Sequence, residues 1–195
     1  MINYRYDITG FVLAGGKSSR MGRDKALIPL HGTSMIEYAT RSLLPVCSTV
    51  AIIAGNDRYR ELGYPVYADV VPDSGPLAGI CTGLAVSDSP LNIFVCCDSP
   101  FVTPEFWSFL LDRTGGCDAV VPRSGDVLYP LTAVYKKSCL PVFRERLDTG
   151  KLKVREAIRC VRTNEIDMPR DFSSFDDKML ANFNTPLELG KFLKP

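Results

Sequence analysis

Residues 13–25, reading LAGGKSSRMGRDK, constrain the fold most, because an apolar run ends there in two adjacent glycines and a cationic loop. The apolar run, residues 8–14, has the composition of a buried strand. Between Lys17 and Lys25 the loop carries four cationic side chains against one anionic side chain, Asp24. Glycines allow backbone N–H groups to approach phosphate oxygens closely, so this loop suits a polyanion such as a nucleoside triphosphate.

Two common phosphate-binding motifs do not account for the loop. The dinucleotide fingerprint requires G-x-G-x-x-G, whereas the glycines here stand at positions 15, 16 and 22. The P-loop requires four residues between its glycines and then Lys, whereas here five residues separate Gly16 from Gly22 and Arg23 follows. The loop therefore matches neither pattern, although its glycines can present backbone N–H groups to phosphates as those motifs do.

The rest of the chain alternates apolar, β-branched runs with helical patterns. Strands are expected at residues 49–54, 66–71, 93–97 and 118–122, and helices at residues 34–44, 77–86 and 104–112. In the second half, residues 131–135 are a candidate antiparallel strand, residues 163–168 an edge strand, and residues 140–147, 153–160 and 187–193 helices. This order predicts an α/β fold with a mostly parallel sheet and an antiparallel addition, in one domain over residues 1–195.

Glycines or carboxylates stand where several predicted strands end: Gly15 and Gly16, then Asp69, then Asp98. In parallel sheets ligands gather beyond the carboxyl ends of the strands, so we expect one shared site. Asp98 either caps the helix that follows it or coordinates Mg²⁺, which is commonly held by one or two carboxylates and phosphate oxygens. Asp69 is either a second carboxylate of the site or a turn residue. The cations of the loop either contact phosphates or are solvated at the surface.

Composition excludes several classes of protein. The net charge of +1 argues against a nucleic-acid binder, and no segment is apolar for long enough to span a membrane. The N-terminus lacks the apolar core of a signal peptide, so we expect a cytoplasmic protein. The seven cysteines form no C-x-x-C pair, which favours free, mostly buried thiols. With His31 as the single histidine, neither a zinc site nor a Ser-His-Asp hydrolase is expected.

The pattern L-A-G-G-x-x-x-R-M-G-x-D-K of residues 13–25 resembles the signature of the molybdenum cofactor guanylyltransferases. The resemblance continues through G-P-L-A-G at residues 75–79, through Asp98 followed by Ser-Pro, and through N-F-N-T-P at residues 182–186. It therefore extends over nearly the whole chain, in the same order. The opening signature alone is typical of the wider nucleotidyltransferase superfamily. The later motifs restrict the resemblance to the molybdenum cofactor guanylyltransferases.

The resemblance implies a Rossmann-like, three-layer nucleotidyltransferase fold. It also implies a reaction in which GMP from GTP is joined to the phosphate of molybdenum-loaded molybdopterin, with release of pyrophosphate and Mg²⁺ as the cofactor. Transient contacts with other proteins of molybdenum cofactor biosynthesis are compatible with it. The implied nucleotide-binding residues are Leu13, Ala14, Gly15, Gly16, Lys25, Asp69 and Asp98. The implied catalytic residues are Arg20, Lys25 and the Mg²⁺ ligand Asp98, and the implied substrate-binding residues are Asn182 and Asn184.

One position departs from the family pattern. Relatives often carry Asn at the end of the second strand, where this chain has Ala54, with Asn56 two residues later. The departure bears on one polar contact to the nucleoside and not on the reaction class. Two alternatives stay open: a related nucleotidyltransferase that uses CTP or a sugar-phosphate acceptor, and a nucleotide sensor without turnover.

Overall fold

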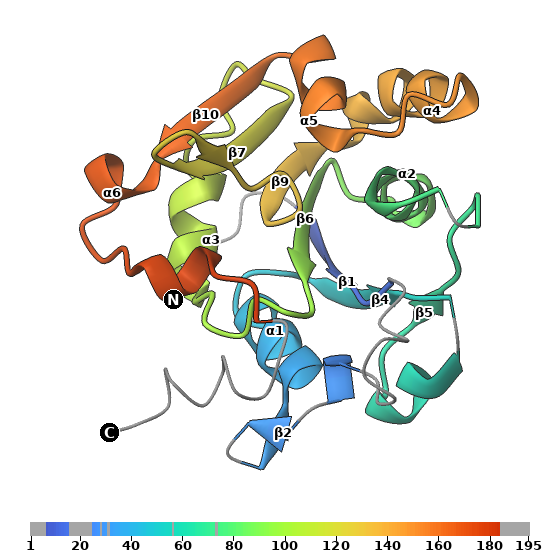
Figure 1. The fold of residues 1–195 in the computed structure, drawn as a ribbon, viewed down its shortest axis with the longest axis vertical. Helices are drawn as coiled ribbons and strands as arrows, with labels where there is room; N and C mark the ends of the chain where they lie inside the picture. The colour runs from blue at the N-terminus through green and yellow to red at the C-terminus, as the bar shows by residue number, and fades with distance from the viewer. Residues whose placement is uncertain are drawn as a thin grey trace.

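The computed structural model describes residues 7–15, 25–27, 29–30, 32–55, 57–72 and 74–183. Within these ranges the chain builds one eight-stranded sheet in the order β10-β7-β9-β6-β1-β4-β5, with β8 paired to β7 (Figure 1). The strands of this sheet are β1 (Ile8–Leu13), β4 (Thr49–Ile53), β5 (Val66–Tyr67), β6 (Leu91–Cys96), β7 (Ala119–Ser124), β8 (Val127–Leu128), β9 (Ala133–Lys136) and β10 (Thr163–Asp167). A separate two-stranded pair consists of β2 (Pro29–Leu30) and β3 (Thr33–Ser34).

Six α-helices and several 3-10 turns accompany the strands of the described chain. The helices are α1 (Met35–Leu43), α2 (Pro76–Val86), α3 (Pro104–Leu111), α4 (Leu140–Asp148), α5 (Val154–Ala157) and α6 (Met168–Asp171). The 3-10 turns are η2 (Lys25–Leu27), η3 (Asp57–Leu62), η4 (Lys137–Cys139), η5 (Ile158–Cys160) and η6 (Asp177–Leu180). No helix in the described ranges is both long enough and apolar enough to cross a membrane.

The sheet is mostly parallel. Strand β1 pairs in parallel with β4 and β6, β4 pairs in parallel with β5, and β10 pairs in parallel with β7. Strand β9 runs antiparallel to both of its neighbours, β6 and β7. The predicted α/β fold with an antiparallel addition is therefore confirmed.

Helices cover both faces of the sheet, with α1 and α3 on one face and α2, α4 and α5 on the other (Figure 1). Alternate residues of β1 supply the two hydrophobic cores, because successive side chains of a strand point to opposite faces. Ile8 and Val12 belong to the core on the α1 and α3 side, whereas Phe11 and Leu13 belong to the core on the α2 and α4 side. The result is a three-layer arrangement with β1 near its centre.

Small residues bring α2 close to the sheet. A Cβ atom at Gly83 would lie 2.6 Å from Cε1 of Phe94 and 3.1 Å from Cδ2 of Phe11. These two rings stack with centroids 5.1 Å apart, and Phe94 meets Tyr135 edge-on at 5.8 Å. The helix can therefore rest directly on a layer of aromatic rings.

Helix starts follow local hydrogen bonding. Glu37 closes a capping box at α1 by accepting from the backbone N–H of Ser34 at 2.8 Å and from its hydroxyl at 2.6 Å. Thr103 caps α3 by accepting from the N–H of Phe106 at 3.4 Å, and Pro104 fills the first helical position. The start of α3 thus needs no carboxylate from the preceding turn.

Several predicted boundaries need correction. The third strand was expected over residues 66–71, but β5 ends at Tyr67, since the N–H of Val70 donates to the hydroxyl of Thr82 on α2 instead of a strand. The helical pattern of residues 153–160 divides into α5 and a 3-10 turn. Strands β2, β3 and β8 and helix α6 were not predicted, because each is too short to show a period. The predicted terminal helix at residues 187–193 lies outside the described residues.

The seven cysteines are free thiols, as predicted. Cys81, Cys117 and Cys139 are buried, and Cys160 is exposed. Cys96 and Cys97 are half-buried where β6 ends, beside Asp98. Cys96 and Cys97 are therefore the cysteines closest in sequence to Asp98, a residue of the predicted site.

Candidate active site

The backbone that leaves β1 is fixed by its neighbours in the sheet. The carbonyl of Leu13 accepts from the N–H of Cys97 at 3.1 Å, and the N–H of Ala14 donates to the carbonyl of Ile53 at 2.9 Å. Gly15 is then the first residue beyond these sheet bonds. Among residues 13–15, Gly15 is therefore the one best placed to offer its N–H to a ligand.

Other predicted members of the loop cannot be placed. Gly16 and Arg20 lie outside the described residues, as do Asn56 and His31. The backbone of Lys25 begins the 3-10 turn η2, and its side chain is outside the described part of the structure. The contribution of the loop cations to the site stays a prediction.

Asp69 is held between the end of β5 and helix α2. Two residues before it, the carbonyl of Tyr67 accepts from the N–H of Ala54 at 2.9 Å. Immediately after it, the N–H of Val70 donates to Oγ1 of Thr82 at 2.9 Å. The backbone is thus anchored on both sides of Asp69, and its side chain is directed toward the first turns of α2 and the end of β1.

The carboxylate of Asp69 lies against two glycines. A Cβ atom at Gly79 would lie 3.4 Å from Oδ1 of Asp69, and one at Gly15 would lie 3.9 Å from Oδ2. These glycines come from α2 and from the end of β1, far apart in sequence. The absence of side chains there leaves the carboxylate close to both backbones.

Asp69 is electrostatically unusual. Its Oδ1 is buried and has no hydrogen-bond partner among the residues that the structure describes. Burial raises the pKa of this carboxyl above its ordinary value of 3.8. Because an unpaired buried acceptor is costly, the position suits a ligand that brings N–H or O–H donors.

Asp98 lies in the turn that follows β6. The capping interpretation of this residue is wrong, because Thr103 caps the next helix. The carbonyl of Asp98 accepts from the N–H of Phe183 at 3.1 Å, so its backbone is held by the far end of the described chain. The side chain is half-buried at the carboxyl end of the sheet.

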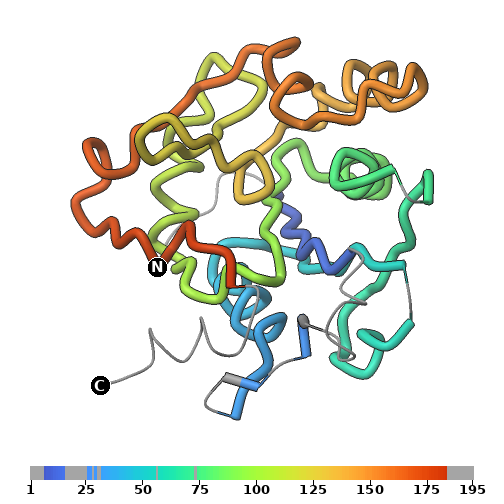
Figure 2. Tube along the Cα trace, in the orientation of Figure 1, coloured from blue at the N-terminus to red at the C-terminus, as the bar shows by residue number. Residues whose placement is uncertain are grey.

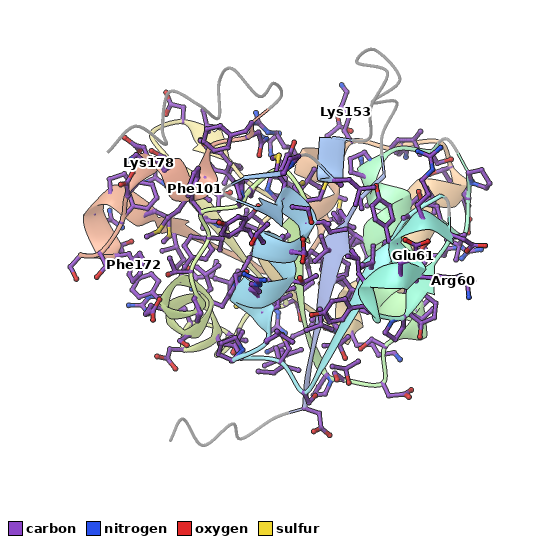
Figure 3. The ribbon with its side chains drawn as sticks, turned by 90° about the horizontal axis from the view of Figure 1, so that it is seen from below. Arg60, Glu61, Phe101, Lys153, Phe172 and Lys178 are labelled. Atoms are coloured by element: carbon purple, nitrogen blue, oxygen red, sulfur yellow. The ribbon has the colours of Figure 1, made fainter. Side chains whose placement is uncertain are left out.

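Asn182 is brought to the same place. The hydroxyl of Ser99 donates to Oδ1 of Asn182 at 3.2 Å, and the ring of Phe183 meets that of Phe101 edge-on at 5.2 Å. Figure 2 shows the red end of the described chain returning beside the green segment that follows β6, and Figure 3 labels Phe101. Asn184, the other predicted substrate-binding residue, lies outside the described residues.

The donor set at the strand ends fits Mg²⁺. This ion takes oxygen ligands and usually combines one or two carboxylates with phosphate oxygens and water. Asp98 offers a half-buried carboxylate where β6 ends, which is one such oxygen donor. Neither thiolates nor imidazoles are needed for such a site.

A groove of about 490 Å³ adjoins these residues, and we call it the side groove. Its walls are residues 128–132 and 152–155, and Pro76, Cys96 and Asn182 complete it. The sequence did not predict the wall residues as functional, because they form no motif and come from separate segments. The strand-end site therefore continues into a cavity of the size that small-molecule sites usually have.

Comparisons with known proteins agree with this arrangement. The family model described as "MobA-like NTP transferase domain" matches residues 10–165. A probable molybdenum cofactor guanylyltransferase from Carboxydothermus hydrogenoformans is 36% identical over 191 residues, covering 96% of each chain. A molybdenum cofactor guanylyltransferase from Cupriavidus necator is 36% identical over 197 residues, covering 95% of this chain and 96% of the relative.

Solved structures show the same fold. Molybdopterin-guanine dinucleotide biosynthesis protein A from Archaeoglobus fulgidus superposes with a TM-score of 0.79 at 24% identity, covering 94% of this chain and 95% of that chain. A nucleotidyl transferase from Methanothermobacter thermautotroptrophicus gives a TM-score of 0.72 at 17% identity, covering 95% of both chains. The architecture is therefore that of nucleotidyltransferases.

Proposed function

The chain belongs to the MobA-like NTP transferase family, and from this premise we propose that it transfers GMP from GTP to the phosphate of molybdenum-loaded molybdopterin. That it is a nucleotidyltransferase follows from the family. The choice of GTP and molybdopterin is supported by the names of relatives that match along nearly the whole chain. Membership of this transferase family also favours a catalytic protein over the alternative, a nucleotide sensor without turnover.

The observation that carries the proposal is the position of the Asp69 carboxylate. Its Oδ2 lies toward Gly15 at the end of β1, and its buried Oδ1, which lies toward Gly79 of α2, has no partner among the described residues. We assign this carboxylate to N–H or O–H donors of the guanosine, while the N–H of Gly15 serves the phosphates. A bound nucleotide would then lie across the ends of β1, β4 and β5.

The reaction needs no general base. An ionised oxygen of the acceptor phosphate attacks the α-phosphorus of GTP, a new P–O bond forms, and the bond from the α-phosphorus to the oxygen bridging to the β-phosphate breaks. That oxygen keeps the electron pair and departs with pyrophosphate. Side chains therefore act through position and charge, as is general for phosphoryl-type transfer.

The residues then have the following roles. Asp98 would hold Mg²⁺, which supplies charge neutralisation at the phosphates when bound. Lys25 and Arg20 would compensate the negative charge that develops during transfer. Asn182, fixed by its bond with Ser99, would face the acceptor.

A thermal-shift panel with GTP, CTP, ATP and UTP, each with Mg²⁺, tests the choice of nucleotide. A ligand at about 100 times its Kd adds about 2.7 kcal/mol of stability, which raises the Tm by roughly 5–10 °C for a chain of this size. We expect the largest rise with GTP. A larger rise with CTP would refute the assignment of the base.

A turnover assay tests the reaction. Labelled GTP is incubated with molybdenum-loaded molybdopterin and Mg²⁺, and the GMP-linked product and pyrophosphate are measured. Equal amounts of both are expected. Stabilisation by GTP without either product would favour the nucleotide sensor instead.

A further inference from the structure

The side groove has one firmly built apolar wall, formed by residues 128–132 between β8 and β9. Leu128 and Leu131 pack against the core beneath α2 and α4, and Tyr129 packs against the core on the opposite face of the sheet. The hydroxyl of the fully buried Tyr135 donates to the carbonyl of Pro130 at 2.6 Å. The wall is therefore anchored from both cores and has little freedom to move.

Backbone and side-chain bonds fix the wall further. The N–H of Tyr129 donates to the carbonyl of Pro122 at 2.9 Å, and the carbonyl of Tyr129 accepts from the N–H of Thr132 at 3.1 Å. From the facing wall, Nη2 of Arg155 donates to the carbonyl of Leu128 at 3.3 Å. The two walls are thus connected by a hydrogen bond.

The facing wall combines an exposed apolar side chain with positive charge. Leu152 is 37% exposed, which is high for a leucine beside a cavity. Lys153 is 81% exposed and extends outward, as Figure 3 shows, with its Nζ 3.3 Å from Oε1 of Glu156, and Arg155 adds a second cation. The described residues that line the groove include no acidic side chain. This combination fits a ligand with a ring whose faces can pack against apolar side chains and with an anionic group.

The groove is continuous with the strand-end site. Cys96, which lines it, is two residues before Asp98, and Asn182 is bonded to Ser99. The nucleotide determinants, Gly15 and Asp69, lie on the other side of β6, toward β4 and β5. Two substrates that react with each other must meet between these regions, at the end of β6.

We propose that the side groove binds the acceptor of the nucleotidyl transfer, with Tyr129 and Leu152 as the residues that contact the faces of its ring system. This inference rests on the proposed function, since it assigns the second substrate of that reaction. The ring packs between Tyr129 and Leu152, and the acceptor's phosphate is directed toward Asp98. Tyr129 contributes through its ring and not through its hydroxyl.

Steady-state kinetics of three variants test the assignment, with molybdenum-loaded molybdopterin as the acceptor. Tyr129→Ala and Leu152→Ala are each expected to raise the acceptor KM about 10-fold, the scale of losing one ring-stacking or apolar contact, and to leave the KM for GTP unchanged. Tyr129→Phe is expected to keep both KM values within about twofold of the unaltered chain, because it retains the ring. Because Leu152 is exposed, its truncation tests the groove even if Tyr129→Ala unfolds.

Val127→Ala is the matched control, because Val127 is 45% exposed on β8 and does not line the groove. A transfer reaction in which Tyr129→Ala and Leu152→Ala both leave the acceptor KM unchanged would overturn the groove assignment alone. A rise in the KM for GTP instead would also overturn it. Absence of any GMP-linked product from the unaltered chain would overturn the proposed function, and the groove assignment with it.

Discussion

Asp69→Asn should stabilise the ligand-free protein while weakening its binding of GTP. The substitution preserves the shape of the side chain and removes a charge from a half-buried position where Oδ1 has no partner among the described residues. Burying a carboxylate oxygen without a partner costs about 1–3 kcal/mol, and the neutral amide relieves the lower part of that range because it carries no charge to desolvate, although its own polar atoms stay unpaired there. We expect a gain of about 1 kcal/mol at pH 7, or a Tm higher by about 2–4 °C.

The gain should depend on pH in a defined direction. Well below pH 3.8, Asp69 is protonated in both the folded and the unfolded chain, so its carboxyl gives no difference. As the pH rises, the unfolded chain ionises first, because burial raises the pKa of Asp69 in the folded chain. The unaltered protein therefore loses stability relative to Asp69→Asn as the pH rises from about 3.8 to the folded-state pKa, and the difference stays constant above that pKa. The difference should be largest at neutral pH.

Thermal unfolding of both proteins from pH 4 to pH 8, with and without GTP, measures both effects. Replacing a charge-assisted hydrogen bond by a neutral one should weaken GTP binding about 10-fold. Asp126→Asn is the control, because Asp126 is exposed in the turn between β7 and β8. If Asp69→Asn lowered the Tm of the ligand-free protein while Asp126→Asn did not, the carboxylate would already be stabilised, and our reasoning would be wrong.

Three further predictions concern the metal ligand, the packing of α2 and the cap of α3. Asp98→Ala should slow turnover by roughly 10²–10³-fold at saturating GTP and Mg²⁺; wild-type turnover in that assay would exclude Asp98 from the chemistry. Gly83→Ala should destabilise the fold by about 1–3 kcal/mol, since the new Cβ would lie 2.6 Å from the ring of Phe94, with the affinity for GTP unchanged. Denaturant unfolding measures this loss, and an unchanged midpoint would show that the ring can move aside. Thr103→Ala should cost about 0.5–2 kcal/mol by removing the cap of α3, and a loss of that size on Asp98→Ala alone would return the capping role to Asp98.

Local pattern predicted much of the fold. The β-branched runs at β1, β4 and β6 are apolar throughout because these strands are covered on both faces, and that property is visible in the sequence. The helices α1, α2 and α3 were predicted within a residue or two, since capping and period are local. The predicted boundaries were wrong where a contact with a residue distant in sequence ends an element. Strand β5 is an example, because Thr82 of α2 helps to end it after two residues.

The sequence by itself determined that β1 ends in a glycine-rich cationic loop and that carboxylates follow other strands, because composition and order are linear properties. It also determined the family, through motifs spaced along the chain. Only the tertiary structure decided that Asp69 faces Gly15 and Gly79, that Thr103 rather than Asp98 caps α3, and that a groove adjoins the end of β6. The physical reason is that burial, close approach and cavities are created by segments that meet only when strands such as β9 take their places in the sheet.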